Sequence, residues 1–173
     1  MVPRVAMHLQ AHAPETRFQF YLSLDPKRTA WLKIARRAAI LGVREMVNTV
    51  GEVPPESAPA FYENADAMFL PTVLESFSAA YAEAMAMGVP IVTSDLPFAR
   101  SICRGSALYF KPDDPRAAAD CLRRLSSDRA LRERLSAEGR AVLSRLPSPR
   151  ERLEAYLAFC ERVHAQHSEG GKT

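Results

Sequence analysis

Two glutamates near the middle of the chain have a spacing that could support chemistry on a sugar. Glu75 follows a short apolar run that ends at Pro71, and Glu83 lies eight residues further on, which is about two turns of a helix at about 3.6 residues per turn. An ionised carboxylate accepts two hydrogen bonds, so this pair suits the vicinal hydroxyls of a sugar. Without further context, Glu75 would only stabilise a helix N-terminus and Glu83 would be a solvated residue.

The residues after Glu75 add hydrogen-bond donors. Residues 78–87 have a helix-forming composition, and Gly88-Val89-Pro90 is a strong stop signal. The backbone amides of Ser76, Phe77 and Ser78 would then lie at a helix N-terminus, where N–H groups lack partners and the dipole is positive. Such an end favours an anion or a hydroxyl-rich ligand.

The rest of the chain alternates short β-prone runs with longer helical runs. The helical runs are 3–13, 27–41, 57–64, 78–87 and 115–166, and the β-prone runs are 17–24, 46–50, 67–70, 91–93 and 107–110. This order predicts a Rossmann-like α/β domain with a doubly wound, mostly parallel sheet over residues 1–166, followed by a disordered tail over 167–173. Ligands of such sheets bind at the carboxyl ends of the strands.

Composition excludes several classes of protein. The chain has 173 residues, 47% hydrophobic and 25% charged, and its net charge of +3 is too small to indicate nucleic-acid binding. It has no apolar run of about 18 residues and no signal-peptide core. Three cysteines without CxxC spacing indicate reduced thiols in a cytoplasmic chain. His8 and His12 have helical i,i+4 spacing but no third ligand, so we expect no metal site.

The segment from Leu70 to Pro90 resembles the signature of retaining GT-B glycosyltransferases, particularly glycosyltransferase family 4. That signature is a proline-ended strand, E-G-F-G, a second Glu after seven intervening residues, and A-M-A-x-G-x-P. The matching stretches of this chain are Leu70-Pro71, Glu75-Ser-Phe-Ser, Glu83-Ala-Met-Ala and Gly88-Val-Pro90. Weaker matches extend the resemblance over nearly the whole chain, at residues 50–53, 61–62, 65–66, 91–95, 110–115 and 152–156.

The resemblance implies a donor-binding domain for a nucleotide sugar, the C-terminal half of a GT-B fold. Glu83 would bind the ribose hydroxyls, and Glu75 would be the catalytic carboxylate that binds the donor sugar near its reacting carbon. The amides of Ser76, Phe77 and Ser78 would hold the sugar and the diphosphate, and the main chain of Val53 would meet the base. The sugar would be transferred with retained configuration through an oxocarbenium-like transition state, with no cofactor and no metal required.

The chain departs from the family pattern at two places. Serines at 76 and 78 replace the glycines of E-G-F-G, so positive φ is less easily reached there. The family domain also opens with a strand and a loop that carries an Arg and a Lys, whereas this chain begins at what resembles the following helix. Its Arg4, Lys27 and Arg28 stand elsewhere. We therefore expect a sheet without its central first strand, and an acceptor domain or an upstream polypeptide segment as partner.

Three alternatives remain open at this point. The chain could be a non-catalytic nucleotide-sugar-binding or regulatory module, or a GT-B enzyme of another kind such as a nucleotide-sugar epimerase. The Arg-rich stretch over 116–152 is also rich in Asp and Glu, which is typical of the solvated face of amphipathic helices. The alternative for that stretch is peripheral contact with an anionic membrane that holds a lipid-linked acceptor.

Overall fold

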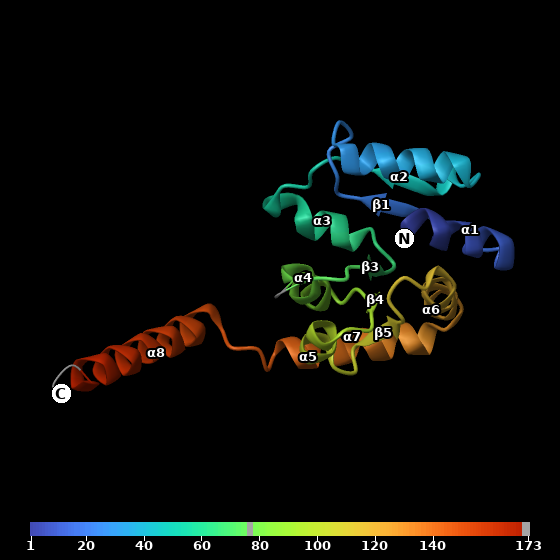
Figure 1. Cartoon of the computed structure of the whole chain (residues 1–173). Helices are drawn as coiled ribbons and strands as arrows, with labels where there is room; N and C mark the ends of the chain where they lie inside the picture. Colours follow the sequence, from blue (N-terminus) through green and yellow to red (C-terminus); the bar gives the residue numbers. More distant parts are fainter. Residues whose placement is uncertain (76–77, 171–173) are drawn as a thin grey trace. The chain divides into compact units, whose positions relative to one another are not determined.

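The computed structural model describes residues 1–75 and 78–170, which fall into two compact units, Met1–Leu143 and Ser144–Thr173. The first unit is an α/β domain (Figure 1). Its helices are α1 (Val2–His12), α2 (Thr29–Ile40), α3 (Ala58–Glu63), α4 (Ala79–Met87), α5 (Pro97–Cys103), α6 (Pro115–Ser127) and α7 (Arg129–Leu143). Its strands are β1 (Phe20–Leu22), β2 (Val47–Thr49), β3 (Met68–Leu70), β4 (Ile91–Ser94) and β5 (Ala107–Phe110), and two short 3₁₀ turns cover Arg44–Met46 and Pro55–Ser57.

All strand pairs of the domain are parallel, as the sequence predicts. β1 pairs with β2, and a second sheet has the order β3-β4-β5, with Leu70 opposite Thr93 and Ser94 opposite Phe110. β1, β2 and β3 are shorter than the β-prone runs that contain them, whereas β5 coincides with its run and β4 is one residue longer.

A break divides the sheet between β1 and β3. Within the described residues these two strands are not paired with each other, although the rings of Phe20 and Phe69 meet edge to face across the break with centroids 5.8 Å apart. Each of the two strands therefore has one edge without a ladder partner in the described chain.

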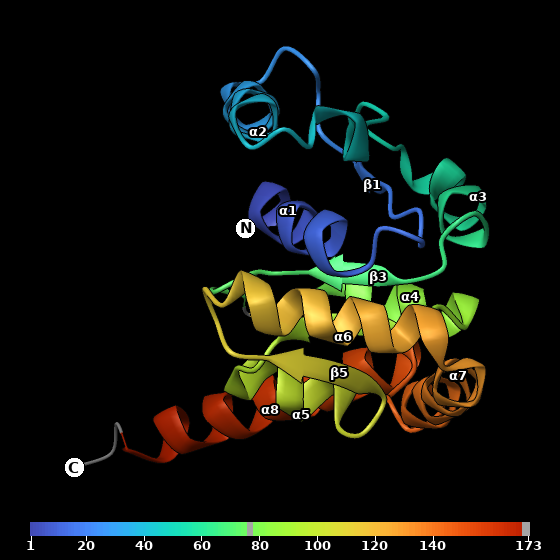
Figure 2. The same ribbon diagram turned by 90° about the vertical axis from the view of Figure 1, so that its right-hand side faces the viewer.

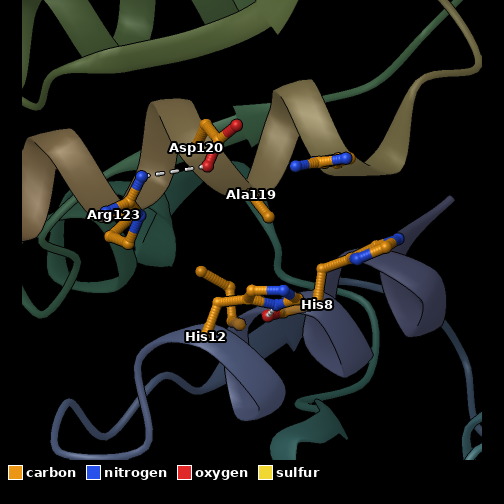
Figure 3. A pocket seen from close by; sticks show the side chains of 7 residues that line it. His8, His12, Ala119, Asp120 and Arg123 are labelled. Carbon is orange, nitrogen blue, oxygen red and sulfur yellow. Dashed lines mark hydrogen bonds and ion pairs between the residues drawn. The ribbon is translucent and has the colours of Figure 1, made fainter.

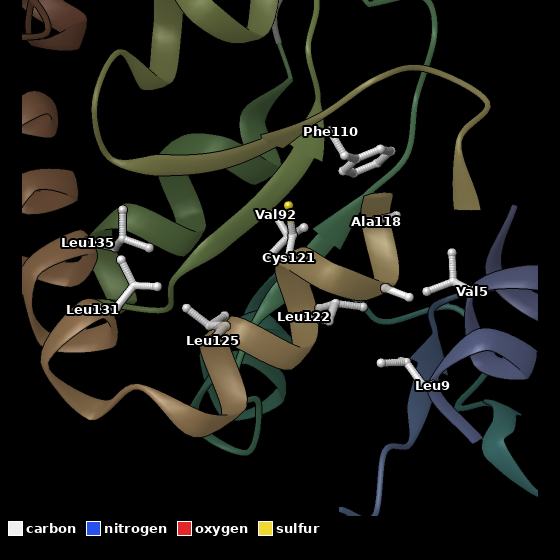
Figure 4. Packing of buried hydrophobic residues seen from close by; sticks show 11 residues of the cluster. Val5, Leu9, Val92, Phe110, Ala118, Cys121, Leu122, Leu125, Leu131 and Leu135 are labelled. Atoms are coloured by element: carbon white, nitrogen blue, oxygen red, sulfur yellow. The ribbon is translucent and has the colours of Figure 1, made fainter. Parts of the chain in front are cut away.

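Hydrophobic clusters cover both faces of the three-stranded sheet. On one face, Val92 and Phe110 pack with residues of α1, α6 and α7 (Figure 4), and α1 and α6 lie side by side (Figure 2). On the other face, Ile91 and Ala107 pack with residues of α4, α5 and α7, including Tyr81 and Cys103. A third cluster, around Trp31 of α2 and Val47 of β2, supports the two-stranded sheet.

Local signals fix the ends of the helices. α6 begins at Asp114, whose carboxylate accepts hydrogen bonds of 3.0 Å from the N–H groups of both Arg116 and Ala117. α4 ends at Gly88, whose φ of 68° is left-handed. Both ends are where the sequence predicts them.

The second unit contains the helix α8 (Pro149–Gly170). Its predicted capping box forms: the Ser148 N–H donates to Glu151 Oε2 at 2.7 Å, and the Glu151 N–H donates to Ser148 Oγ at 3.2 Å. The boundary between the two units lies between Leu143 and Ser144, and the described side chains of α8 are exposed. α8 extends to Gly170, and residues 171–173, the end of the predicted tail, lie outside the described residues.

Candidate functional site

The connection from β3 to α4 carries the first candidate carboxylate. Glu75 lies in this loop, at the carboxyl end of β3, and it is half-buried. Ser78 is the N-cap residue of α4, with extended backbone, and its hydroxyl does not cap the helix. The first N–H groups of α4 therefore have no partner in the Ser78 side chain. Ser76 and Phe77, the other two predicted donors, lie outside the described residues.

Glu83 is an exposed residue in the middle of α4 and has a specific partner. The hydroxyl of Tyr62, from α3, donates a hydrogen bond of 3.0 Å to Glu83 Oε2. Burial raises the pKa of Tyr62 far above its usual value, and the hydrogen bond to Glu83 raises it further. Tyr62 thus stays a protonated donor throughout the neutral range, and it holds one of the two oxygens of the carboxylate.

Two consecutive hydrogen bonds connect the buried face of α4 with the sheet. Tyr81 lies on the opposite face of α4 from Glu83, and its hydroxyl is 2.8 Å from Thr93 Oγ1. Thr93 Oγ1 in turn donates to the carbonyl of Leu70 at 3.0 Å, so the order of donors is Tyr81, then Thr93. Burial raises the pKa of Tyr81; the hydrogen bond with Thr93 opposes this increase, and Cys103 and then Glu75 add to it. These two hydrogen bonds connect α4 with β4 and with the end of β3, the strand that precedes Glu75.

The loops after β1 and β2 form the neighbouring part of the carboxyl edge. The Thr49 hydroxyl bonds to the carbonyls of Leu22 and Leu24, and it accepts a hydrogen bond of 3.1 Å from the N–H of Gly51, whose φ is 80°. The loop therefore leaves β2 with a fixed turn, and this turn leads to Val53, which is half-buried. The structure thus places the Val53 main chain and the Glu75 loop after strands of the two different sheets.

Two basic residues near this edge, Arg28 and Arg100, are paired with acids. The Arg28 guanidinium lies 4.0 Å from carboxylate oxygens of both Asp25 and Glu52, with its own side chain exposed. After β4, Arg100 forms two hydrogen bonds with Asp95, at 2.6 and 2.8 Å, and its guanidinium lies 4.0 Å from the centroid of the Tyr109 ring. The hydrogen bond from Arg100 holds the pKa of Asp95 below its usual value.

Sequence reasoning missed two of these contacts. Asp95 and Arg100 are five residues apart across the start of α5, which is not a helical pair spacing, so no sequence pattern indicates their contact. Tyr62 and Glu83 are 21 residues apart on different helices. The only sequence signal for Tyr62 is its place in a stretch that resembles the family.

A cavity of about 290 Å³ lies between α1 and α6, away from the predicted site (Figure 3). Its lining residues are His8, Leu9, His12, Arg116, Ala119, Asp120 and Arg123. His12 Nδ1 lies 2.9 Å from the carbonyl of His8, one turn back in the same helix. Over the part of the chain that the structure describes, no three His, Cys, Asp or Glu side chains are grouped so that they could hold a metal ion.

Among the described helices, none is both long enough and apolar enough to cross a membrane.

Curated proteins and solved structures resemble this chain over most of its length. A D-inositol 3-phosphate glycosyltransferase from Xylanimonas cellulosilytica is 30% identical over 146 residues, which are 83% of this chain and 35% of the relative. A phosphatidyl-myo-inositol mannosyltransferase from Mycobacterium leprae is 36% identical over 107 residues, 60% of this chain and 29% of the relative. The chain thus spans about a third of the length of these relatives.

The fold matches solved structures closely. An alpha,alpha-trehalose 6-phosphate synthase from Burkholderia multivorans superposes with a TM-score of 0.79 at 19% identity, over 99% of this chain and 41% of that one. TarM from S. aureus, in a complex that includes UDP, superposes with a TM-score of 0.77 at 17% identity, over 91% of this chain and 31% of that one.

The sequence pattern of the family described as "Glycosyl transferases group 1" matches residues 31–142, from α2 to α7, and this range contains both candidate glutamates. The match covers well over half of the chain, so the chain belongs to the glycosyl transferases group 1 family.

Proposed function

We propose that this chain is the donor-binding half of a retaining glycosyltransferase of family 4. The whole enzyme would transfer a sugar from a nucleotide-diphosphate sugar to a glycan, a lipid-linked molecule or another acceptor. The observation that carries the proposal is the arrangement around α4: Glu75 precedes the helix at the carboxyl end of β3, and Glu83 stands on its exposed face. The names of the relatives, which are sugar transferases, support the same class of reaction.

Each predicted residue has a role in this proposal. Glu83 accepts hydrogen bonds from the ribose hydroxyls, and the main chain of Val53 meets the base. Glu75 binds the donor sugar, whose ring gains positive charge as its bond to the diphosphate breaks. The amides of Ser76, Phe77 and Ser78 would bind the diphosphate and stabilise the negative charge that develops on it. The proposal includes no metal and no cofactor.

The proposal places the remaining parts of the reaction outside this chain. The acceptor would bind to an acceptor domain or an upstream segment, since the chain spans about a third of its relatives. We place the reaction in the cytoplasm, with peripheral membrane contact if the acceptor is lipid-linked. No nucleic acid takes part.

Calorimetry with UDP, GDP and ADP tests the nucleotide site directly. Glu83→Ala removes the ribose acceptor and should weaken binding by about 1.5–3 kcal/mol, the range for hydrogen bonds to a charged group. Glu63→Ala, at the end of α3, is the matched control because Glu63 is also an exposed helical glutamate, and it should bind as the wild type does. Unchanged affinity of a folded Glu83→Ala variant would remove the ribose role.

A further inference from the structure

The hydroxyl of Tyr62 has three acceptors within reach and one proton. Glu83 Oε2 lies 3.0 Å away, the carbonyl of Ala80 lies 3.5 Å away, and the sulfur of Met68 lies 4.0 Å away. The carboxylate oxygen is both the nearest acceptor and the charged one, so it receives the proton. The other two contacts show that the Tyr62 hydroxyl lies against α4 and β3.

The helix that carries Tyr62 is fixed at both ends. Pro59 lies in its first turn. Asn64, the C-cap residue directly after the helix, donates a side-chain hydrogen bond of 2.8 Å to the carbonyl of Ala60. The ring of Phe61 meets the Tyr62 ring edge to face, with centroids 6.3 Å apart. Tyr62 therefore presents its hydroxyl from a constrained position.

Glu83, in contrast, is an exposed side chain with three rotatable bonds on a helix face that is open to water. Such a side chain loses rotamer freedom when it must hold one geometry, and a ligand that requires this geometry binds more weakly. A partner that orders the side chain in advance removes part of this loss.

We infer that Tyr62 is a positioning residue, which holds the Glu83 carboxylate ready for the two ribose hydroxyls of a nucleoside diphosphate. This inference rests on the proposed function. A carboxylate has about four lone-pair sites; Tyr62 uses one, and the other three suffice for two hydroxyl donors. Tyr62 itself does not touch the ligand.

The test compares ribonucleotides with nucleotides that lack the diol. Tyr62→Phe keeps the ring and removes the donor, so the Kd for UDP, GDP or ADP should rise about five- to tenfold. The Kd for the 2′,3′-dideoxy counterparts should stay the same, because they have no diol for Glu83 to hold. In Tyr62→Phe/Glu83→Ala, the affinity should be no lower than in Glu83→Ala alone.

Two further variants separate positioning from packing. Tyr109→Phe is the matched control, since the Tyr109 ring is also half-buried and its hydroxyl donates to the Arg104 carbonyl at 2.6 Å, so it should not change either Kd. Tyr62→4-aminophenylalanine restores an N–H donor toward Glu83 and should recover most of the affinity. If circular dichroism shows that Tyr62→Phe is unfolded, the 4-aminophenylalanine variant is compared with the wild type instead. A folded 4-aminophenylalanine variant that does not bind the ribonucleotide would overturn the inference.

The outcomes distinguish this inference from the proposed function. If Glu83→Ala weakens binding and Tyr62→Phe does not, the positioning role is wrong and the proposed function stands. Equal weakening of ribo- and dideoxynucleotides by Tyr62→Phe would show a structural role instead. If Glu83→Ala has no effect, or if none of the three nucleotides binds, the proposed ribose site is wrong and the role of Tyr62 is lost with it.

Discussion

Replacing Thr93 with valine should lower stability more than replacing Tyr81 with phenylalanine, although both changes break the same hydrogen bond. Both residues are fully buried, and the Tyr81 hydroxyl donates to Thr93 Oγ1, which donates to the carbonyl of Leu70. In Tyr81→Phe, Thr93 keeps its own acceptor, so the loss should be that of one neutral hydrogen bond, about 1 kcal/mol. In Thr93→Val, the Tyr81 hydroxyl stays buried without an acceptor and Leu70 loses a donor, which should cost about 2–3 kcal/mol.

Urea unfolding followed by circular dichroism measures these differences, provided that the m-values agree. The double variant should cost less than the sum of the two single variants, because the Tyr81 hydroxyl is no longer buried without an acceptor, although Leu70 still lacks its donor. Thr29→Val, at an exposed position at the start of α2, is the matched control and should change stability by less than about 0.5 kcal/mol. Equal costs for the two single variants, or a double variant that costs their sum, would refute the assigned donor order.

Two other predictions address the reaction and the response to pH. In the complete enzyme, Glu75→Gln keeps the shape of the side chain and removes its charge. The kcat should fall about 10²-fold, which corresponds to about 2.7 kcal/mol, with a smaller change in donor affinity. Steady-state kinetics measures kcat and calorimetry measures donor affinity; unchanged turnover, or binding without transfer, would favour the non-catalytic module. Burial raises the pKa of Cys103 from 9.0 to about 12. Above pH 9 the thiol therefore stays neutral in the folded state while the thiol of the unfolded chain ionises. The contribution of this group to the free energy of unfolding is present below pH 9 and is lost as the pH rises toward 12. Between pH 8 and pH 10 this one group should remove about 1.3 kcal/mol, and urea titrations of Cys103→Ala should lack that part of the decline.

The sequence predicts best those features that depend on neighbouring residues. The stop at Gly88 and the caps at Asp114 and Ser148 are short-range, because each is formed by groups within a few residues of one another. The order of strands and helices follows from hydrophobic periodicity for the same reason, and with it the parallel sheet.

Features that depend on tertiary packing were not predictable in this way. The contact between Tyr62 and Glu83 requires two helices to lie in one particular register, and no local pattern specifies that register. Residues 115–166 read as one run of helices, and within that run Leu153, Tyr156 and Leu157 of α8 are apolar but exposed. Periodicity identifies an apolar face, but it does not identify what covers that face.

Helix α1 contributes to two cores, and this gives it a particular part in the folding cooperativity of the domain. Its Val5 and Leu9 pack with the cluster on the three-stranded sheet, whereas Ala6 packs with Trp31 and Val47 at the two-stranded sheet. Since the sheets share no ladder hydrogen bonds in the described chain, packing through such an element must transmit the stability of one half to the other.

A nucleotide bound as proposed would also contact both halves. Val53 follows a strand of one sheet, and Glu83 stands on a helix that follows a strand of the other. Binding would then stabilise the arrangement of the two sheets, so the donor would act as a reversible cross-link between the two halves of the domain. Substitutions in α1 would weaken nucleotide affinity without touching the ligand, since they loosen the arrangement that the ligand requires.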